Sequence, residues 1–210
     1  MENGLKTSPV DDKQLKKVSR DLHFIDLLTE LAKKNNMRII VHGGYAVDGF
    51  FQRITRPHND VDLGVWGNKP DGLEMIKQLV VGIGKEVPEF NNLSLEDKGR
   101  NDWTHRVTAK KDDFIAEMYY AQVDYSPFDS EKRIIKKDGT VDAQQHQTQT
   151  VTLAGVTFEA TTPLLAIVDR LYKQKRGDGI KTPHTQDIEN LRLITNQEEV
   201  RKRLETYTGG

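Results

Sequence analysis

The clearest hydrophobic pattern in the chain lies over residues 38–66. A short apolar run at residues 39–41, bounded by polar residues, is typical of a buried strand. Two glycines follow at residues 43–44 and lead into a helix-like segment. After a polar turn, residues 60–66 alternate charged and apolar side chains, as a half-buried strand does. The pattern therefore predicts a strand, a short helix and a second strand, around which we expect the other elements to be arranged.

Helical periodicity flanks this stretch on both sides. Apolar residues fall three or four positions apart over residues 11–35, which predicts a long amphipathic helix that packs its apolar stripe on a sheet. A second helix is expected over residues 70–81, with Gly82 and Gly84 ending it. The polar residues 86–102 favour no single element.

The middle of the chain has the pattern of short strands. Residues 103–110 alternate like a strand, residues 111–113 suit a turn, and residues 114–123 form the expected hairpin partner. Further strands are expected at residues 133–135, 150–153 and 156–160, with glycines marking the turns between them.

The C-terminal third changes to helical patterns. Thr162 and Pro163 are expected to begin a helix, with the threonine as its cap and the proline at the first helical position. Two more helices are predicted, over residues 183–194 and 197–207.

These elements together predict an α+β protein. At 210 residues the chain can form one domain with a helical appendage. We expect a mixed β-sheet flanked by helices in residues 1–160, and a small helical region, residues 161–210, packed on it.

Composition and charge narrow the functional classes. The formal net charge is −1, so no overall field attracts long nucleic acids or an acidic membrane surface. The chain has no cysteine, which excludes disulfides, thiol nucleophiles and cysteine-ligated zinc. The first residues lack the apolar core of a signal peptide, and no apolar run is long enough to cross a membrane. A cytoplasmic location without a membrane partner is the resulting expectation.

The chemistry of the central stretch lies in two aspartates and two glycines. Asp60 and Asp62 project from the same face of one strand, where two carboxylates repel each other unless a hard divalent cation lies between them. Gly43 and Gly44 stand at a strand-to-helix junction, where backbone amides and a helix N-terminus favour an anion such as phosphate. A phosphate cradle joined to a magnesium-binding carboxylate pair indicates phosphoryl or nucleotidyl transfer.

The same residues resemble a known motif. The segments GGYAVD at residues 43–48, RITR at 53–56 and HNDVDL at 58–63 are similar to the core of the antibiotic nucleotidyltransferases. These are the aminoglycoside and lincosamide adenylyltransferases, within the DNA polymerase β-like superfamily. The resemblance implies the polymerase β-like nucleotidyltransferase fold, and the spacing matches the aminoglycoside branch.

The resemblance also implies a third carboxylate on the hairpin that follows the aspartate strand. Glu117 is the best match, because it lies inside an otherwise apolar strand, where a carboxylate is costly unless it is paired or bound to metal. The third carboxylate of the family is usually an aspartate, so Asp124, seven residues later, is its rival, with a strand-end turn as the alternative role of Asp124. We therefore expect Asp60, Asp62 and Glu117 to be the catalytic residues and to bind two Mg²⁺ ions, with Glu117 accepting the proton of an attacking hydroxyl.

Three further residues are expected to contact the nucleotide. By resemblance, Arg56 and His58 would lie near the phosphates or the metal ions, where an arginine offsets developing charge. Lys173 is a candidate phosphate contact from the helical region, weighed against a solvated basic face that also holds Arg176 and Lys181. Asp187 is expected to brace one of these cations. Asp48 matches the family, and its alternative role is to anchor the loop before His58.

The resulting hypothesis is an enzyme that transfers a nucleotidyl group from ATP or another nucleoside triphosphate to a hydroxyl of a small molecule. By resemblance the acceptor is an aminoglycoside or a lincosamide. A cationic aminoglycoside would require an acidic pocket, for which the candidates are Glu86, Glu89, Glu96, Asp97, Asp102, Asp112 and Asp113. Two alternatives stay open: a toxin-type enzyme that modifies protein or tRNA, and a nucleotide-binding relative without activity. The sequence is compatible with a homodimer and does not fix the oligomeric state.

Overall fold

The computed structural model describes residues 4–100, 104–123, 132–135, 141–144, 147–175 and 182–208. Within these residues the helices are α1 (Asp12–Lys34), α2 (Gly43–Phe51), α3 (Gly72–Glu86), α4 (Pro163–Lys175), α5 (Thr182–Arg192) and α6 (Gln197–Thr208), with a short 3-10 helix η1 (Pro88–Phe90). The strands are β1 (Met37–Val41), β2 (Val61–Gly67), β3 (Ser94–Arg100), β4 (His105–Lys111), β5 (Phe114–Gln122), β6 (Lys132–Ile135), β7 (Val141–Gln144), β8 (Thr148–Leu153) and β9 (Val156–Thr161).

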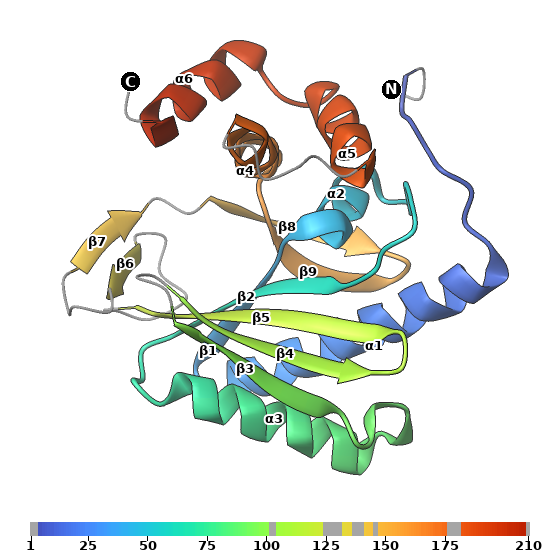
Figure 1. The fold of residues 1–210 in the computed structure, drawn as a ribbon, viewed down its shortest axis with the longest axis vertical. Coiled ribbons are helices and arrows are strands. Elements are labelled where there is room, and N and C mark those ends of the chain that lie inside the picture. The colour runs from blue at the N-terminus through green and yellow to red at the C-terminus, as the bar shows by residue number, and fades with distance from the viewer. Residues whose placement is uncertain are drawn as a thin grey trace.

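The described strands build one large mixed sheet and one small one. The large sheet has seven strands in the order β3-β4-β5-β2-β1-β9-β8, and β6 pairs with β7 separately. The central strand β2 is antiparallel to β1 and parallel to β5. Helices lie on both sides of this sheet (Figure 1). The α+β class expected from the sequence is confirmed.

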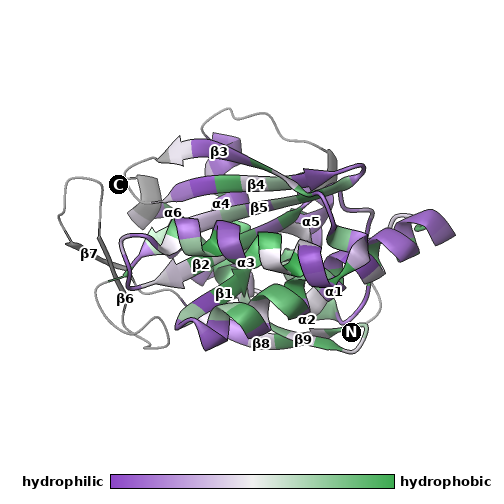
Figure 2. Cartoon of the chain, turned by 90° about the horizontal axis from the view of Figure 1, so that it is seen from below, coloured by the Kyte–Doolittle hydropathy of each residue, from purple (hydrophilic) through white to green (hydrophobic). Residues whose placement is uncertain are grey.

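The two faces of the sheet differ in chemistry because side chains alternate along each strand. Ile39, Leu63 and Met118 point to one face, where they are buried in the main hydrophobic core. The helices α1 and α3 cover that face, and their ribbons mix hydrophilic and hydrophobic residues when seen from below (Figure 2). The opposite face carries Asp62 and Glu117, which are direct partners in the β2–β5 register.

The C-terminal helices lie on the face that carries the two carboxylates (Figure 1). Helix α2 contacts β2, β8 and β9 on one side and α4 and α5 on the other. A second apolar cluster joins these helices and consists of Val47, Ala166, Ile167, Val168, Leu191 and Val200. Helix α2 is thus the element that connects the sheet to the C-terminal helices.

The long N-terminal helix follows the sequence closely. It begins after Asp11, whose side chain accepts a hydrogen bond from the backbone of Gln14, while the Gln14 side chain accepts one from the backbone of Asp11. Its buried positions include Val18, Leu22 and Ile25, which belong to the predicted apolar stripe.

Helix α3 is longer than predicted, because it passes through both glycines that were expected to end it. A Cβ added at Gly84 would lie 2.6 Å from the carbonyl oxygen of Phe90, so this glycine allows η1 to pack closely against the helix. The polar stretch that follows contains η1 and the edge strand β3. The expectation that Gly82 and Gly84 end the helix was therefore wrong.

The start of α4 also differs from the prediction. The helix begins at Pro163 as expected, and the backbone oxygen of Thr162 accepts the first helical bond, from Ala166. The Thr162 hydroxyl is buried and has no hydrogen-bond partner among the described residues, so it does not cap the helix. Among the described helices, none combines the length and apolar character needed to cross a membrane.

Candidate active site

The first of the two glycines lies directly against an aspartate. The backbone of His42, at the end of β1, donates to the Asp62 carbonyl, which holds the start of α2 beside β2. Gly43 has a φ of +63°, in the left-handed region that glycine adopts without cost. A Cβ at Gly43 would overlap the Asp62 carboxylate. The glycine therefore permits the Asp62 side chain to lie on the backbone turn.

The second glycine packs against the loop before β2. A Cβ at Gly44 would overlap the His58 ring and would lie 2.8 Å from Nη2 of Arg56. The glycine turn therefore contacts the loop before β2 at Gly44. Together, Gly43 and Gly44 form the N-terminal end of α2, whose backbone amides have no partner within the helix and can receive an anion.

Buried Asp48 anchors this loop. Its Oδ1 accepts hydrogen bonds from the backbone and the hydroxyl of Thr55, at 2.9 and 2.6 Å. Its Oδ2 lies 2.5 Å from Nε2 of His58. Arg56 donates to Nδ1 of His58, so the ring proton is on Nε2 and is donated to Asp48. The anchoring role considered for Asp48 matches this geometry.

These contacts place His58 differently from the expectation. The residue is only 6% exposed, and both ring nitrogens are hydrogen-bonded inside the protein. No ring atom is available to bind a phosphate or a metal ion while these bonds persist. His58 therefore supports the loop from within, and the predicted direct nucleotide contact is not compatible with this arrangement.

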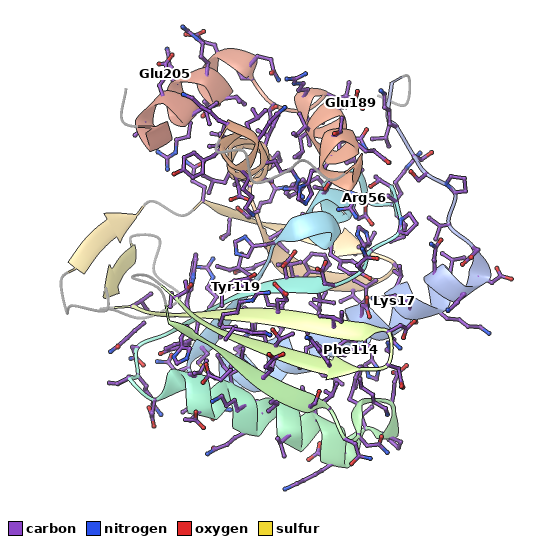
Figure 3. All side chains as sticks on the ribbon, in the orientation of Figure 1. Lys17, Arg56, Phe114, Tyr119, Glu189 and Glu205 are labelled. Atoms are coloured by element: carbon purple, nitrogen blue, oxygen red, sulfur yellow. The ribbon has the colours of Figure 1, made fainter. Side chains whose placement is uncertain are left out.

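Arg56 lies beside α2, on the side that faces α5 (Figure 3). A guanidinium has five N–H donors. Arg56 uses Nε and Nη2 to bind both oxygens of Asp187, each at 2.9 Å, and Nη1 to bind Pro57 and His58. The remaining Nη2 donor lies next to Gly44. Asp187 also binds Arg170, so it braces these two arginines rather than Lys173.

The charges of Asp60 and Glu117 act on Asp62, which lies against the glycine turn. Asp62 is opposite Glu117 in the sheet, and Asp60 stands exposed just before β2. Burial, and then the negative charges of Asp60 and Glu117, raise the pKa of Asp62 to about 6. The positive charges of Lys173 and Arg170 oppose this shift. The positive charges of the protein therefore do not fully stabilise an ionised Asp62.

Glu117 has partners of its own. One carboxylate oxygen pairs with Arg106, and the other accepts a hydrogen bond of 2.6 Å from the Tyr119 hydroxyl. The Arg106 guanidinium lies over the Tyr119 ring, 5.4 Å from its centroid. Tyr119 lies on the sheet face that carries the C-terminal helices (Figure 3). The rival third carboxylate, Asp124, lies outside the described residues.

The residues around Asp62 fit magnesium in their ligand type and charge. Carboxylate oxygens are the ligands that this hard cation prefers, and the positive charges that act on Asp62 do not offset its burial and the nearby negative charges. Among the described residues, no group of three or more histidine, cysteine, aspartate and glutamate side chains is arranged to hold an ion. Asp60 and Asp62 would therefore hold the metal. Glu117 lies opposite Asp62 and is paired with Arg106, and its own contact with a metal ion stays a prediction.

The helical region contributes one expected cation and one unexpected one. Lys173 is half exposed and pairs with Asp169 at 2.8 Å, yet its charge acts on Asp62. Arg170 is buried and donates to the carbonyl oxygen of Gly43 at 3.0 Å. The sequence carried one signal for Arg170, a charged residue among the apolar positions of α4. Arg176 and Lys181 lie outside the described residues.

Several of the acidic residues expected around a cationic acceptor pair with cations of the protein itself. Three of the described members pair with cations: Glu96 with Lys98, Asp97 with Lys77, and Asp113 with Arg20. Glu89 lies 3.5 Å from the His23 ring. Arg20 and His23 belong to α1, on the face away from Asp62. Asp102 lies outside the described residues.

A glycine turn beside paired carboxylates on a mixed sheet of this kind defines a nucleotidyltransferase of the polymerase β-like class. The family model described as aminoglycoside-2''-adenylyltransferase matches residues 24–155, which is more than half of the chain. The chain therefore belongs to the aminoglycoside-2''-adenylyltransferase family. No protein in a search of curated sequences matches it.

Solved structures show the same fold at low identity. The solution structure of the antibiotic-resistance factor ANT(2'')-Ia is 16% identical, with a TM-score of 0.62 over 91% of this chain and 92% of that one. A crystal structure of ANT(2'')-Ia with adenylyl-2''-tobramycin is also 16% identical, with a TM-score of 0.61 over 90% and 98%. The lincomycin-bound lincosamide adenylyltransferase LnuA is 14% identical, with a TM-score of 0.55 over 90% and 100%.

Proposed function

We propose that this protein transfers a nucleoside monophosphate, AMP from ATP, to a hydroxyl of an aminoglycoside or lincosamide antibiotic and releases pyrophosphate. One observation carries the proposal. The Asp62 carboxylate lies on the Gly43 backbone at the N-terminal end of α2, so a metal-binding group and an anion-binding turn share one position. A triphosphate bound with magnesium requires this combination of neighbours.

In this proposal the glycine turn binds the phosphates and the two aspartates bind magnesium. Backbone amides at the start of α2 would receive the phosphate oxygens, with Lys173 adding positive charge from α4. Asp60 and Asp62 would hold magnesium. When bound, magnesium neutralises the triphosphate and polarises the reacting phosphorus. These groups would orient the α-phosphate towards the face of β2 and β5 that carries Asp62 and Glu117.

In this proposal Glu117 accepts a proton from the acceptor. The acceptor oxygen forms a bond to the α-phosphorus, the bond from that phosphorus to the bridging oxygen breaks, and pyrophosphate leaves with the electron pair. The acceptor proton passes to the Glu117 carboxylate. Arg106 and Tyr119 fix the orientation of that carboxylate through their contacts with its two oxygens.

The acceptor class is supported by the family and by the ligands of the structural relatives. The relatives carry adenylylated tobramycin and lincomycin, which are aminoglycoside and lincosamide antibiotics. In β3 and the hairpin turn, Glu96 and Asp113 pair with cations of the protein, which reduces the negative charge left to attract a polycation. An assay should therefore include acceptors of low charge as well as aminoglycosides.

The proposal is tested by transfer of label from α-labelled ATP to a panel of aminoglycosides and lincosamides, with magnesium present. Asp60→Asn and Asp62→Asn should each lower transfer by about 10²-fold or more, as removal of a group that acts on the transition state does. Asp26→Asn is the matched control, because Asp26 is an exposed aspartate on α1, on the opposite face of the sheet. Undiminished transfer by Asp60→Asn would overturn the mechanism.

The same assay separates the alternatives. Label that appears in protein or tRNA of a cell extract, and not on antibiotics, would identify a toxin-type enzyme. Tight binding of ATP with magnesium, without pyrophosphate release on any acceptor, would identify an inactive nucleotide-binding protein.

A further inference from the structure

Two C-terminal helices reach the back of the glycine turn through buried charges. Asp187 on α5 is fully buried, and Arg170 on α4 is 7% exposed. Asp187 binds Arg56 through two hydrogen bonds of 2.9 Å and binds Arg170 through Nη2 at 2.9 Å. Figure 3 shows Arg56 at the junction of the loop, α2 and α5.

We propose that Asp187 and Arg170 are positioning residues, which set the spacing between the Gly43–Gly44 turn and the loop that leads to Asp60. This inference rests on the proposed function and assigns a role in it to the C-terminal helices. Each of the two arginines that Asp187 holds contacts one glycine of the turn. Arg170 donates to the Gly43 carbonyl at 3.0 Å, and Arg56 lies against Gly44.

The donors of both arginines are almost fully used in this cluster. Arg170 binds Asp187 through Nε and Nη2, Ala166 through Nη1 and Gly43 through Nη2, so four of its five N–H groups have protein partners. Donors engaged in this way act on the nucleotide through the backbone they hold. The cluster therefore fixes the direction of the amides at the start of α2.

The ionised form of Asp187 holds the cluster together. Burial opposes ionisation, but hydrogen bonds and charge from Arg56, with the charge of Arg170, outweigh it and lower the pKa of Asp187. Asp187→Asn would keep the shape of the side chain and leave two buried guanidinium groups without their shared anion. The guanidinium of Arg56 also holds His58, so the disturbance would extend to the loop before Asp60.

A positional role predicts a selective kinetic effect. Asp187→Asn and Arg170→Lys should each raise the KM for ATP by about tenfold, a loss of about 1.4 kcal/mol, while the KM for the acceptor changes by less than about twofold. Arg170→Lys keeps the charge but removes the fork that bridges Asp187 and the Gly43 carbonyl. Glu189→Gln is the control on the same helix, because Glu189 is partly exposed and pairs only with Lys6 among the contacts described.

Amide hydrogen exchange gives a readout that does not depend on activity. In both variants the amides of residues 43–47 and 55–59 should exchange faster, while those of β4 stay unchanged. Unchanged exchange at residues 43–47, or an equal increase across the sheet, would overturn the proposal. So would a proportional loss of kcat with both KM values unchanged, because that is the signature of a smaller folded fraction. If the wild-type protein transfers no nucleotide, the proposed function fails, and the exchange pattern still decides the positioning role.

Discussion

At the scale of single residues, Asp62 shows most directly how the site departs from ordinary surface chemistry. Its carboxylate lies on a glycine turn, with Glu117 opposite and Asp60 two residues away. Burial and these like charges raise its pKa to about 6. A protein without a use for this arrangement would gain stability by removing the charge, and a bound cation would offset the cost under the proposed function.

The loss of folding stability caused by ionised Asp62 can be measured in the metal-free protein. The pKa of Asp62 is raised in the folded state, so the folded protein binds its proton more tightly than the unfolded chain does. Stability is therefore lost as the pH rises from about 4 to about 6, where the folded form becomes ionised. Asp62→Asn should be equally stable near pH 4 and more stable by roughly 1–2 kcal/mol at about pH 7.5, after allowance for solvent screening.

Urea denaturation in the presence of a chelator, at several pH values, checks this prediction. Asp26→Asn is again the control, and its difference from the wild-type protein should not vary in this way with pH. A loss of stability in Asp62→Asn at neutral pH would show that the carboxylate is satisfied without a metal.

Individual residues also show what sequence patterns can and cannot supply. The pairing of Asp60 with Asp62, and the place of Glu117 in an apolar strand, follow from alternation along strands. The inward orientation of His58 does not, because it depends on Asp48 and Arg56 meeting around one ring. The Arg56–Asp187 contact joins residues 131 positions apart, and a local pattern carries no information about such a partner.

At the scale of elements, the short helix α2 depends on its surroundings. It has nine residues, and its N-cap, His42, makes no side-chain capping bond. Isolated helices of this length are marginal in water, so tertiary packing must supply the stability. Five consecutive residues from Tyr45 to Gly49 are buried, and the Tyr45 hydroxyl binds Asp21 of α1 at 2.7 Å. The helix is thus held from both sides, with its first turn directed at the site.

Two glycine substitutions distinguish the steric requirement for glycine in this turn from the general effect of glycine on helix stability. Gly44→Ala places a methyl group into the His58 ring and the Arg56 guanidinium, and should destabilise the protein by about 1–3 kcal/mol and weaken ATP binding. Gly82→Ala is the control, because a Cβ at Gly82 meets nothing within 4 Å. As an alanine inside a helix, it should stabilise α3 by up to about 1 kcal/mol.

Calorimetric titration of ATP with magnesium, combined with thermal denaturation, measures both effects. Wild-type affinity in Gly44→Ala would show that the turn does not receive the phosphates. The control also addresses the error in the predicted end of α3. Glycine was interpreted as a helix terminator there, but the interior of α3 tolerates it because Ile76, Val80 and Ile83 bury the helix in the core.

At the scale of the whole molecule, the helices of residues 161–210 and the rest of the chain share their interior. The apolar cluster around Val47 and Leu191 crosses the boundary predicted between residues 160 and 161. The N-terminal arm crosses it as well: Lys6 exchanges two hydrogen bonds with Asn190, and the Ser8 hydroxyl donates to the Gln186 side chain. The Ser8 backbone also donates to the Thr55 carbonyl, in the loop before Asp60. Periodicity located the helices, but it could not show that the arm and α5 clamp the loop before Asp60.

This sharing predicts that the chain unfolds as one unit. Leu191 is fully buried in the cluster that joins α2, α4, α5 and α6, so Leu191→Ala should cost about 2–4 kcal/mol. Because the cluster supports both parts, the unfolding midpoint seen by helical circular dichroism and that seen by Trp66 fluorescence, in a Trp103→Phe background, should fall together. Residues 1–160 alone should lack the cooperative transition, since they would expose Val47 and lose the partner of Arg56.

Two separate transitions in the full chain, or a cooperatively folded 1–160 fragment, would establish the predicted boundary as a true domain boundary. The positioning role of Asp187 would then depend on an interface that can open.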